Sequence, residues 1–592
     1  MVFDDKQNVP SGVRFLSRTM ARSRDCRRQF AEDLRMRCSW LCFLITAVAA
    51  LGMTAPSQGT PSRTYDVVVY GGTASGVITA VAAAREGARV ALIEPRNHLG
   101  GVISGGLGTA DKGREESIGG YSREFFERAG KKYGVPIQWN IEPHVAEEVF
   151  NEMAKEGGVE VFFRNRLRER SGVKKQGTRI AHIKLENGVV FTAKVFVDAS
   201  YEGDLMAQAG VSYIVGRESR DQYGESLAGV YGHDRHFFHF SIPIRAYDEK
   251  GRLLPEISAR KPGPPGSADK GVQTYNFRLC LTQVPDNRVP FAKPAHYDPG
   301  HYALLARYLS ELDRIKQNTP SAATSAALEK MSSELRENLN RPWGIDDVLE
   351  FRPLRNGKTD ANNGALAYST NYVGASWDYP DGNYKKRERI WQAHIDYTQG
   401  LLYFLQHDPH VPQPLHDDLA SWGLCKDEFV DNQHWPYQLY IREGRRMIGE
   451  YVIRQQDLQT EIVKSDSIGM GSYYFDSHPV QRLVSAEGWV DNEGGISMLG
   501  DNPYYPYLKP YQIPYRALLP KRAQATNLLV PVCLSATHVA YSSIRMEPVY
   551  MILGHAAGVA AKMAIDADTA VQDVDPMVLA TKLRTQRAVL EW

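Results

Sequence analysis

Apolar runs and polar turns alternate in residues 65–101 and predict a strand, a helix and a second strand. Residues 65–70 are apolar and rich in β-branched side chains, as in a strand buried on both faces, and they end at a Gly-Gly pair. From residue 73 to about 86 the pattern is that of an alanine-rich helix. A second short strand, residues 88–93, ends in Glu94. This order is typical of the βαβ unit of an α/β protein.

The glycines of this turn predict a dinucleotide site. Gly76 would let the helix pack closely on the strand and turn backbone amides toward a pyrophosphate. Glu94 lies 18 residues beyond Gly76, near the spacing of about 20 at which an acid accepts hydrogen bonds from an adenosine ribose. Thr73 stands where a middle glycine normally admits the phosphates, so we expect a slightly longer turn. The alternative is an ordinary strand-to-helix turn.

The residues after Glu94 favour FAD over a nicotinamide cofactor. Pro95 and Arg96 lead to the pair Gly100-Gly101. This segment resembles the glutathione-reductase-like flavoproteins, in which an acid ahead of a Gly-Gly pair leads the chain along the pyrophosphate toward the flavin. The resemblance recurs in residues 195–204, where a strand runs into a small-residue turn. Such flavoproteins close the FAD domain at this point.

A third match lies near the carboxyl terminus. Residues 535–548 carry His538 and Arg545 and run into a helix rich in alanine and glycine, whose N-terminus could face the flavin pyrimidine. Taken together, the chain resembles the bacterial FAD-dependent oxidoreductase family over residues 65–561. Members of that family begin with a GGT-x-[SA]-G turn, so Thr73 agrees with the family pattern.

The resemblance implies a fold and a cofactor. We expect an α/β chain with a Rossmann-like, glutathione-reductase-like FAD-binding domain and a large inserted α+β substrate domain. FAD should be bound non-covalently, because the sequence contains no visible attachment motif. The expected FAD contacts are Gly71, Gly72, Thr73, Ser75, Gly76, Glu94, Pro95, Arg96, Gly100, Gly101, Asp198, Gly203, Asp204, Glu547 and Gly554.

The domain organisation follows from chain length and from the positions of these motifs. A chain of 592 residues exceeds what one core usually organises, and the cofactor segments lie near both ends. We therefore expect the middle to be inserted. The predicted parts are residues 61–215 and 471–592 for the FAD domain and residues 216–470 for the substrate domain. Within the insertion, residues 302–312 and 322–339 predict a helical hairpin, and residues 440–454 predict a helix.

Residues 1–60 are interpreted as a signal peptide and leader. Arginines precede an apolar stretch, residues 39–52, which is short for a membrane span. The mature chain should begin between about Gly52 and Ser62 and act in the periplasm or outside the cell, with no stable membrane span. The alternatives are a retained anchor, a twin-arginine signal around Arg27 and Arg28, and a misassigned extension over residues 1–35.

Composition limits the kinds of ligand that the protein is expected to bind. A net charge of +1 gives no basic field for nucleic-acid binding, so we expect a small uncharged or weakly charged substrate and no nucleic acid. After loss of the leader, Cys280, Cys425 and Cys533 remain. This odd number at distant positions indicates neither a disulfide framework nor a Cys-x-x-Cys pair, and no metal site is predicted. Each cysteine is interpreted as a small buried hydrophobe.

Proton handling beside the flavin needs histidine, arginine, tyrosine or a carboxylate. His538, His478 and Arg545 are the catalytic candidates from the family-like motifs. Structural alternatives remain open for each: His538 could cap the final helix, Arg545 could pair with Glu547, and residues 476–478 could form only a turn. The substrate-binding candidates are Tyr275, Asn276, Arg278, Arg442 and Arg446.

Arg442 and Arg446 would share one face of the helix predicted over residues 440–454. Solvated charges explain this pair nearly as well as an anion clamp does.

The predicted function is an FAD-dependent oxidoreductase that transfers a hydride between a small organic substrate and flavin N5, with an unidentified electron acceptor. Two alternatives stay open. The aromatic-rich middle, with 31 tyrosines in the chain, could belong to a polysaccharide lyase, which would be colourless. A non-catalytic flavin-binding protein would be yellow but would not bleach with any substrate.

Overall fold

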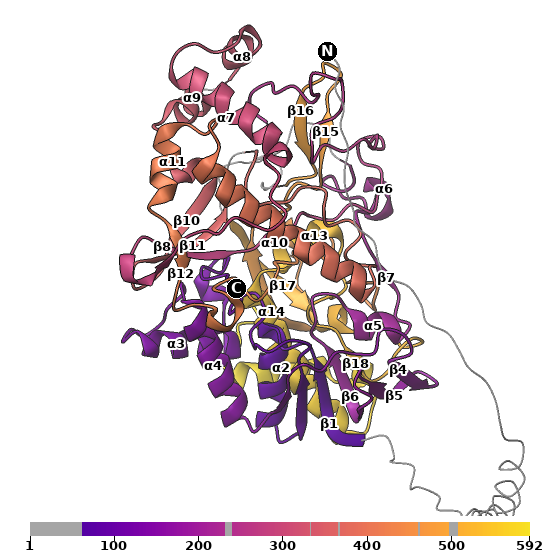
Figure 1. The fold of residues 1–592 in the computed structure, drawn as a ribbon. Coiled ribbons are helices and arrows are strands. Elements are labelled where there is room, and N and C mark those ends of the chain that lie inside the picture. The colour runs from indigo at the N-terminus through magenta and orange to yellow at the C-terminus, as the bar shows by residue number, and fades with distance from the viewer. Residues whose placement is uncertain (1–61, 231–239, 332, 365–366, 460–461, 497–506) are drawn as a thin grey trace, which may run out of the picture. The chain divides into compact units, whose positions relative to one another are not determined.

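The computed structural model describes residues 62–592 apart from 231–239, 332, 365–366, 460–461 and 497–506 (Figure 1). The described residues belong to one compact unit, Thr60–Trp592. The predicted signal peptide and leader, residues 1–60, lie outside them.

The central sheet is built around two parallel strands from distant parts of the chain. Strand β1 pairs in parallel with β2 and β6, and β6 also pairs in parallel with β18. The strands of this sheet, in spatial order, are β3 (Glu160–Phe162), β2 (Val90–Ile93), β1 (Ser62–Tyr70), β6 (Val190–Asp198), β5 (Arg179–Lys184) and β4 (Val173–Gln176), with β18 (Leu528–Leu529) beside β6. The predicted first strand and first helix are confirmed, and the mixed α/β architecture is consistent with a Rossmann-like FAD-binding fold.

Two helices from opposite ends of the chain pack together on this sheet. They are α2 (Ala74–Arg85) and α14 (Glu547–Asp566), shown beside β1 and β6 in Figure 1. A Cβ at Gly554 would lie 2.4 Å from the Ser75 carbonyl oxygen, and one at Gly558 would lie 2.4 Å from that of Thr79. Glycine is therefore required for this close helix contact. Helices α3 (Gly120–Lys132) and α4 (Pro143–Glu156) complete the layer.

Helix α14 also accounts for the apolar character of the carboxyl-terminal region. Among the described residues it is the one helix long and apolar enough to cross a membrane. In the structure, 83% of its apolar window is buried inside the protein.

The middle of the chain forms a second, antiparallel sheet. Its order is β10 (Leu349–Pro353), β11 (Lys358–Asn363), β8 (Leu279–Thr282), β12 (Gly423–Cys425) and β9 (Arg288–Val289). The helices of this region are α7 (Ala303–Lys316), α8 (Ala322–Leu328), α9 (Ser333–Asn340), α10 (Tyr384–His407) and α11 (Gln413–Ala420). All these elements lie in the segment predicted to be inserted; the insertion as a separate domain stays a prediction.

Shorter elements complete the described chain. Two-stranded ladders join β7 (Tyr213–Ile214) to β13 (Arg446–Met447), β14 (Ser467–Tyr473) to β17 (Tyr507–Pro514), and β15 (Gln481–Val484) to β16 (Val490–Glu493). The remaining α-helices are α5 (Asp204–Gln208), α6 (Arg220–Tyr223), α12 (Gln455–Gln459), α13 (His538–Ile544) and α15 (Pro576–Thr585).

The helix predicted over residues 440–454 is wrong. This segment is irregular apart from β13, because its amides bond to distant carbonyls: Tyr440 N to Asn276 O at 2.9 Å and Met447 N to Cys533 O at 3.0 Å. The helix predicted over residues 322–339 is instead split into α8 and α9. Residues 330 and 331 donate to carbonyls three residues back, which ends α8 in a tight turn.

Candidate cofactor and substrate sites

Thr73 caps helix α2 at the turn after β1. Its hydroxyl accepts a hydrogen bond from Gly76 N at 3.1 Å and donates one to Ala199 O at 2.8 Å. The first helical bond runs from Val77 N to Thr73 O, so the amide of residue 75 has no partner within the helix and could face an anion. Thr73 therefore occupies the position of the middle glycine while leaving the start of the helix open.

Gly76 is required for the contact between helix α2 and strand β1. A Cβ at this position would lie 1.9 Å from the carbonyl oxygen of Gly71. Gly72 is confined as well, because a Cβ there would lie 2.9 Å from a carboxylate oxygen of Glu94. The glycine turn thus brings backbone amides directly against the end of β2.

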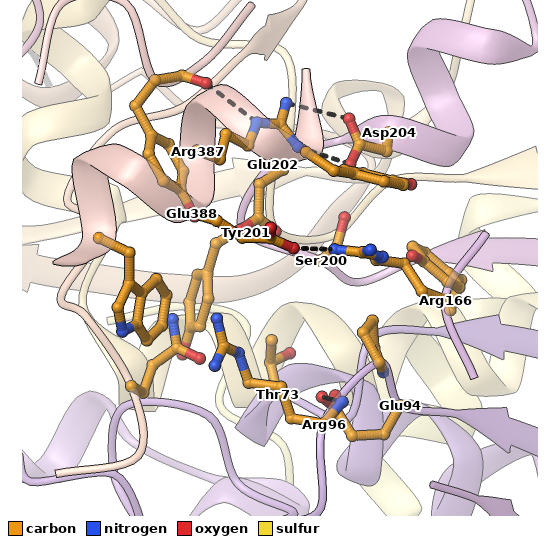
Figure 2. Close-up of a pocket in the computed structure, with 17 residues that line it drawn as sticks. Thr73, Glu94, Arg96, Arg166, Ser200, Tyr201, Glu202, Asp204, Arg387 and Glu388 are labelled. Carbon is orange, nitrogen blue, oxygen red and sulfur yellow. Dashed lines mark hydrogen bonds and ion pairs between the residues drawn. The ribbon is translucent and has the colours of Figure 1, made fainter. Parts of the chain in front are cut away.

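Glu94 ends β2 with its carboxylate held by two backbone amides. Gly72 N donates to Oε2 at 2.7 Å and Arg96 N donates to Oε1 at 2.6 Å. Burial raises the pKa of Glu94 to about 7. The two amides fix the carboxylate at the edge of a cavity of about 290 Å³, which we call the Glu94 cavity (Figure 2).

The Glu94 cavity is lined by six of the predicted cofactor residues: Gly71, Thr73, Glu94, Pro95, Arg96 and Asp204. The residues that sequence reasoning missed are Tyr70, Arg166, Ser200, Tyr201, Glu202, Tyr379, Tyr384, Arg387, Glu388, Trp391 and Gln438. Ser200, Tyr201 and Glu202 stand in the same motif as Asp198 and Asp204, which is a usable signal. No local signal marks the wall contributed by α10, whose Trp391 ring lies 3.7 Å from the Arg96 guanidinium.

Asp204 ties helix α10 to the turn after β6. Its carboxylate forms an ion pair of 2.7 Å with Arg387 (Figure 2) and another of 2.7 Å with Arg445. Asp198 and Gly203 shape the same turn. The Asp198 carboxylate accepts hydrogen bonds from the amides of residues 200 and 206 and from the Ser200 hydroxyl, and Gly203 has a φ of +66°. The structure thus places Asp198 and Gly203 behind the cavity wall, and contact with FAD stays a prediction for both.

A smaller cavity of about 140 Å³ shares Thr73, Glu94, Arg96 and Gln438 with the Glu94 cavity. It also reaches Gly101, where a Cβ would lie 2.4 Å from the Tyr201 hydroxyl. Gly100 and Gly101 adopt φ values of +102° and +58°, which favour glycine. The Gly-Gly pair therefore bends the chain along the cavity.

Two buried oxygens near the start of α2 and α14 suit a bound ligand. The Ser75 hydroxyl and Glu547 Oε2 have no hydrogen-bond partner among the described residues. The other carboxylate oxygen of Glu547 accepts from the Tyr201 hydroxyl at 2.7 Å. Burial raises the pKa of Glu547 to about 8, so this group is protonated at neutral pH and can donate. Gly554 contacts Ser75 by helix packing, and its contact with FAD is untested.

A third cavity, of about 360 Å³, gathers polar side chains from the middle and the carboxyl-terminal part of the chain. We call it the Arg442 cavity. It contains three predicted residues, Arg278, Arg442 and His478, together with Asp111, Arg341, Asp346, Leu349, Glu350, Phe351, Arg352, Asn362, Asn363, Gly364, Tyr440, Tyr473, Tyr474 and Asp476. Asp111 was missed, although it stands three residues after the glycine-rich stretch that ends at Gly108.

Most of the buried cations around this cavity have a carboxylate partner. Arg278 binds Asp360 at 2.5 Å, and Arg545 binds Asp476 at 2.7 Å and the Tyr440 hydroxyl at 2.9 Å. The alternative pairing of Arg545 with Glu547 is therefore wrong, because Asp476 takes its charge.

Arg442 is the exception. Its guanidinium donates to three neutral oxygens: Thr274 O at 2.6 Å, Asn276 Oδ1 at 2.9 Å and Asn363 Oδ1 at 3.1 Å. Within the part of the chain that the structure describes, no carboxylate pairs with it and its buried Nε is unpaired. Burial and the nearby Arg545 lower its pKa to about 9, which leaves it charged at neutral pH. Arg442 is 1% exposed, so the interpretation as a solvated charge is wrong.

His478 lies in the wall of the Arg442 cavity. Its Nε2 is 3.4 Å from Asp476 Oδ2, and its Nδ1 is 3.2 Å from Asn371 Nδ2. Burial, with Arg442 nearby, lowers its pKa to about 3. The imidazole is therefore neutral at physiological pH.

His538 lies in a different environment. It is the first residue of α13, whose N-cap is Thr537. The N-cap of the alanine- and glycine-rich helix α14 is Met546, so a capping role for His538 is wrong. Its Nδ1 is 2.9 Å from Glu443 Oε2, and Arg446 connects Glu443 at 2.8 Å to Glu218 at 2.6 Å. His538 lines none of the three cavities described above.

The other predicted substrate residues form hydrogen bonds to members of these two clusters. The Tyr275 hydroxyl donates to the backbone carbonyl of Glu443, and Asn276 holds the guanidinium of Arg442. Both side chains are fully buried and line none of the three cavities. Arg446 belongs to the His538 network, so Arg442 and Arg446 do not form one clamp.

A family model described as "FAD dependent oxidoreductase" matches residues 66–584. No curated protein matches the sequence. Solved structures match over short segments. One is L-proline dehydrogenase from P. horikoshii, with 17% identity, coverage of 27% of this chain and 59% of that one, and a TM-score of 0.22. Another is THI4 from Thermovibrio ammonificans, with 20% identity, coverage of 30% and 74%, and a TM-score of 0.21. The chain thus spans less than two thirds of the proline dehydrogenase.

Proposed function

The chain belongs to the FAD-dependent oxidoreductase family, and we propose that it transfers a hydride between flavin N5 and a small organic substrate bound in the Arg442 cavity. The observation that carries this proposal is Arg442, a buried guanidinium without a carboxylate partner among the described residues, at the edge of a polar cavity. A buried charge is stable only when it is compensated, so the site suits a substrate with a carboxylate or an oxygen that develops negative charge.

The residues of the Glu94 cavity fit the cofactor. Glu94 is held where it could accept hydrogen bonds from the adenosine ribose, and the open amide of residue 75 at the start of α2 suits the pyrophosphate. The unpaired oxygens of Ser75 and Glu547 offer two further polar contacts. When bound, FAD supplies the two-electron chemistry of the reaction. We propose that it is held non-covalently.

The protein supplies charge, orientation and one proton site. Arg442 binds the anionic group of the substrate, while Asn276 and Asn363 keep the guanidinium in place. His478 accepts or returns the substrate proton, because it lines the Arg442 cavity as a neutral imidazole. Arg545 positions Asp476 next to His478 and does not itself line the cavity.

The cellular setting is part of the proposal. We propose that residues 1–60 are removed on export, that the mature chain has no stable membrane span and binds no nucleic acid, and that a separate acceptor reoxidises the flavin. Amino-terminal sequencing of protein from a native-like host tests export. An intact Met1 in the cytoplasmic fraction would overturn it.

Anaerobic reduction tests the proposed reaction. Purified protein should be yellow, and acid should release all flavin from the pellet if FAD is non-covalent. Hydroxy acids, amino acids, amines and sugars are then screened for bleaching, and each acid is compared with its neutral amide or ester. We expect bleaching by an acid and little by its neutral analogue. Equal bleaching by both would refute the role of Arg442, and a yellow protein that no compound bleaches would favour a binding protein without turnover.

A further inference from the structure

Two of the three cysteines outside the leader face each other across neighbouring strands. Strands β8 and β12 are antiparallel, with Leu281 opposite Leu424 and Thr282 opposite Gly423. This register places Cys280 opposite Cys425, 145 residues away in the sequence, and their sulfurs are 3.1 Å apart. Opposed residues of antiparallel strands have Cα atoms about 4.5–5.5 Å apart, which is within the range of about 4.4–6.8 Å that a disulfide spans.

Cys533 cannot compete for either partner. It packs in a separate core cluster with β1 and β6, where its sulfur is 3.4 Å from the carbonyl oxygens of Ser200 and Tyr201. The odd cysteine count therefore resolves into one matched pair and one isolated thiol. The structure confirms that all three cysteines are buried, and it adds that Cys280 and Cys425 are neighbours.

We propose that Cys280 and Cys425 are a redox-sensitive site, joined by a cross-strand disulfide under oxidising conditions. Both thiols are buried, and burial raises the pKa of the Cys280 thiol. Formation of the bond removes two protons and two electrons from the pair. A small-molecule or protein disulfide of the compartment takes them up and is reduced to two thiols. Because the pair is buried, the exchange takes place while the chain folds or during local opening.

The pair has neighbours that line two of the cavities. Cys280 and Cys425 pack with Phe429 and Tyr437, and Tyr437 lines the small cavity beside Glu94. Arg278, two residues before Cys280, lines the Arg442 cavity. A bond between β8 and β12 would therefore join two strands whose neighbouring residues reach both cavities.

Thiol mapping of the holoenzyme tests this site. The full chain is equilibrated with glutathione mixtures from fully reduced to fully oxidised, alkylated under denaturing conditions, digested and examined by mass spectrometry. We expect a linked peptide of Cys280 and Cys425 at the oxidised end and an alkylated Cys533 throughout. The proposal would be overturned if Cys280 and Cys425 were both alkylated under the most oxidising conditions, even in protein refolded under those conditions. Linkage of either residue to another cysteine would also overturn it.

Thermal unfolding provides a second readout. The oxidised form should unfold several degrees above the reduced form, because the bond closes a loop of 145 residues in the unfolded chain. Cys280→Ser and Cys425→Ser should abolish this redox-dependent shift, and the matched control Cys533→Ser should keep it. If a serine variant fails to fold, Cys280→Ala serves in its place. A shift that persists in the Cys280 variants would contradict the assignment.

Discussion

Arg442 and Arg446 lie four residues apart on one segment and are both fully buried, yet their surroundings differ. Arg446 contacts two carboxylates, Glu443 at 2.8 Å and Glu218 at 2.6 Å, and Glu443 in turn contacts His538. Arg442 contacts only neutral oxygens and borders a cavity with His478. The first cluster is closed within the protein, and the second is open to a ligand.

We propose that this difference separates structural charges from charges that bind a ligand. A buried ion whose partners are all supplied by the protein needs nothing further, and removal of either partner is costly. A buried guanidinium without an anion is a destabilising feature that a bound anion would relieve. Residue type does not distinguish the two clusters, since each combines a buried histidine with buried arginine, but the charge balance around each side chain does.

Replacement of the two histidines tests this distinction with the largest expected effect. His478→Asn should lower the rate of flavin reduction by about 10²–10⁴-fold with flavin content unchanged, because it removes the proposed proton acceptor. His538→Asn should leave the rate per bound flavin within a few-fold and lower the thermal stability instead. Stopped-flow anaerobic reduction and thermal unfolding give the two readouts.

The opposite result would reassign the chemistry. If His538→Asn abolished reduction in a well-folded, flavin-loaded protein and His478→Asn did not, the closed cluster would contain the proton-transfer residue. The His478 cluster would then be limited to substrate binding.

Replacement of the two arginines by methionine tests the same distinction by stability. Here the larger effect is expected in the cluster of Arg446. Arg446→Met leaves Glu218 and Glu443 buried without their cation, and we expect a loss of about 3–5 kcal/mol in the free energy of unfolding. Arg442→Met strands no carboxylate and should cost less, about 1–2 kcal/mol for its hydrogen bonds. Denaturant titration measures both. Equal losses would mean that charge compensation does not distinguish the clusters.

Sequence reasoning succeeded where function depends on local geometry. The strand, the glycine turn and the position of Glu94 follow from spacings within some 30 residues, and the structure has β1, α2 and β2 at those places. It failed where distant segments meet. Helix periodicity over residues 440–454 suggested one face for Arg442 and Arg446, but tertiary hydrogen bonds hold that segment in an irregular conformation apart from β13. The α10 wall and the Cys280–Cys425 pair depend on register between strands and helices far apart in the sequence, which no local pattern encodes.

Glu94 is a buried acid of the second kind, at the proposed cofactor site. Two backbone amides hold its carboxylate, and the residue lines a cavity that a ligand could fill. Glu94→Ala should weaken FAD retention by about 1–3 kcal/mol, because ribose hydroxyls lose their acceptor. Glu94→Gln keeps an acceptor oxygen and is the matched control, with a smaller loss. Equilibrium dialysis of the released flavin measures the affinity. An unchanged affinity in the alanine variant would place the ribose elsewhere.

Glu547 gives a pH dependence of stability, and its sign follows from the pKa of Glu547. In the folded protein the pKa is about 8, whereas an unfolded glutamate titrates near its ordinary value of 4.5. Between these values the folded state keeps a proton that the unfolded state releases, so stability is fully present below about pH 4.5 and falls as pH rises through 8, by about 1 kcal/mol per pH unit. Glu547→Gln mimics the protonated acid and keeps an acceptor for the Tyr201 hydroxyl. Its unfolding free energy should therefore decline less between pH 6 and 8 than that of the parent protein. If the unfolding free energies of the two proteins changed with pH in parallel, Glu547 would be ionised in the folded protein. An unassigned donor or cation would then compensate Glu547 Oε2, which has no partner among the described residues.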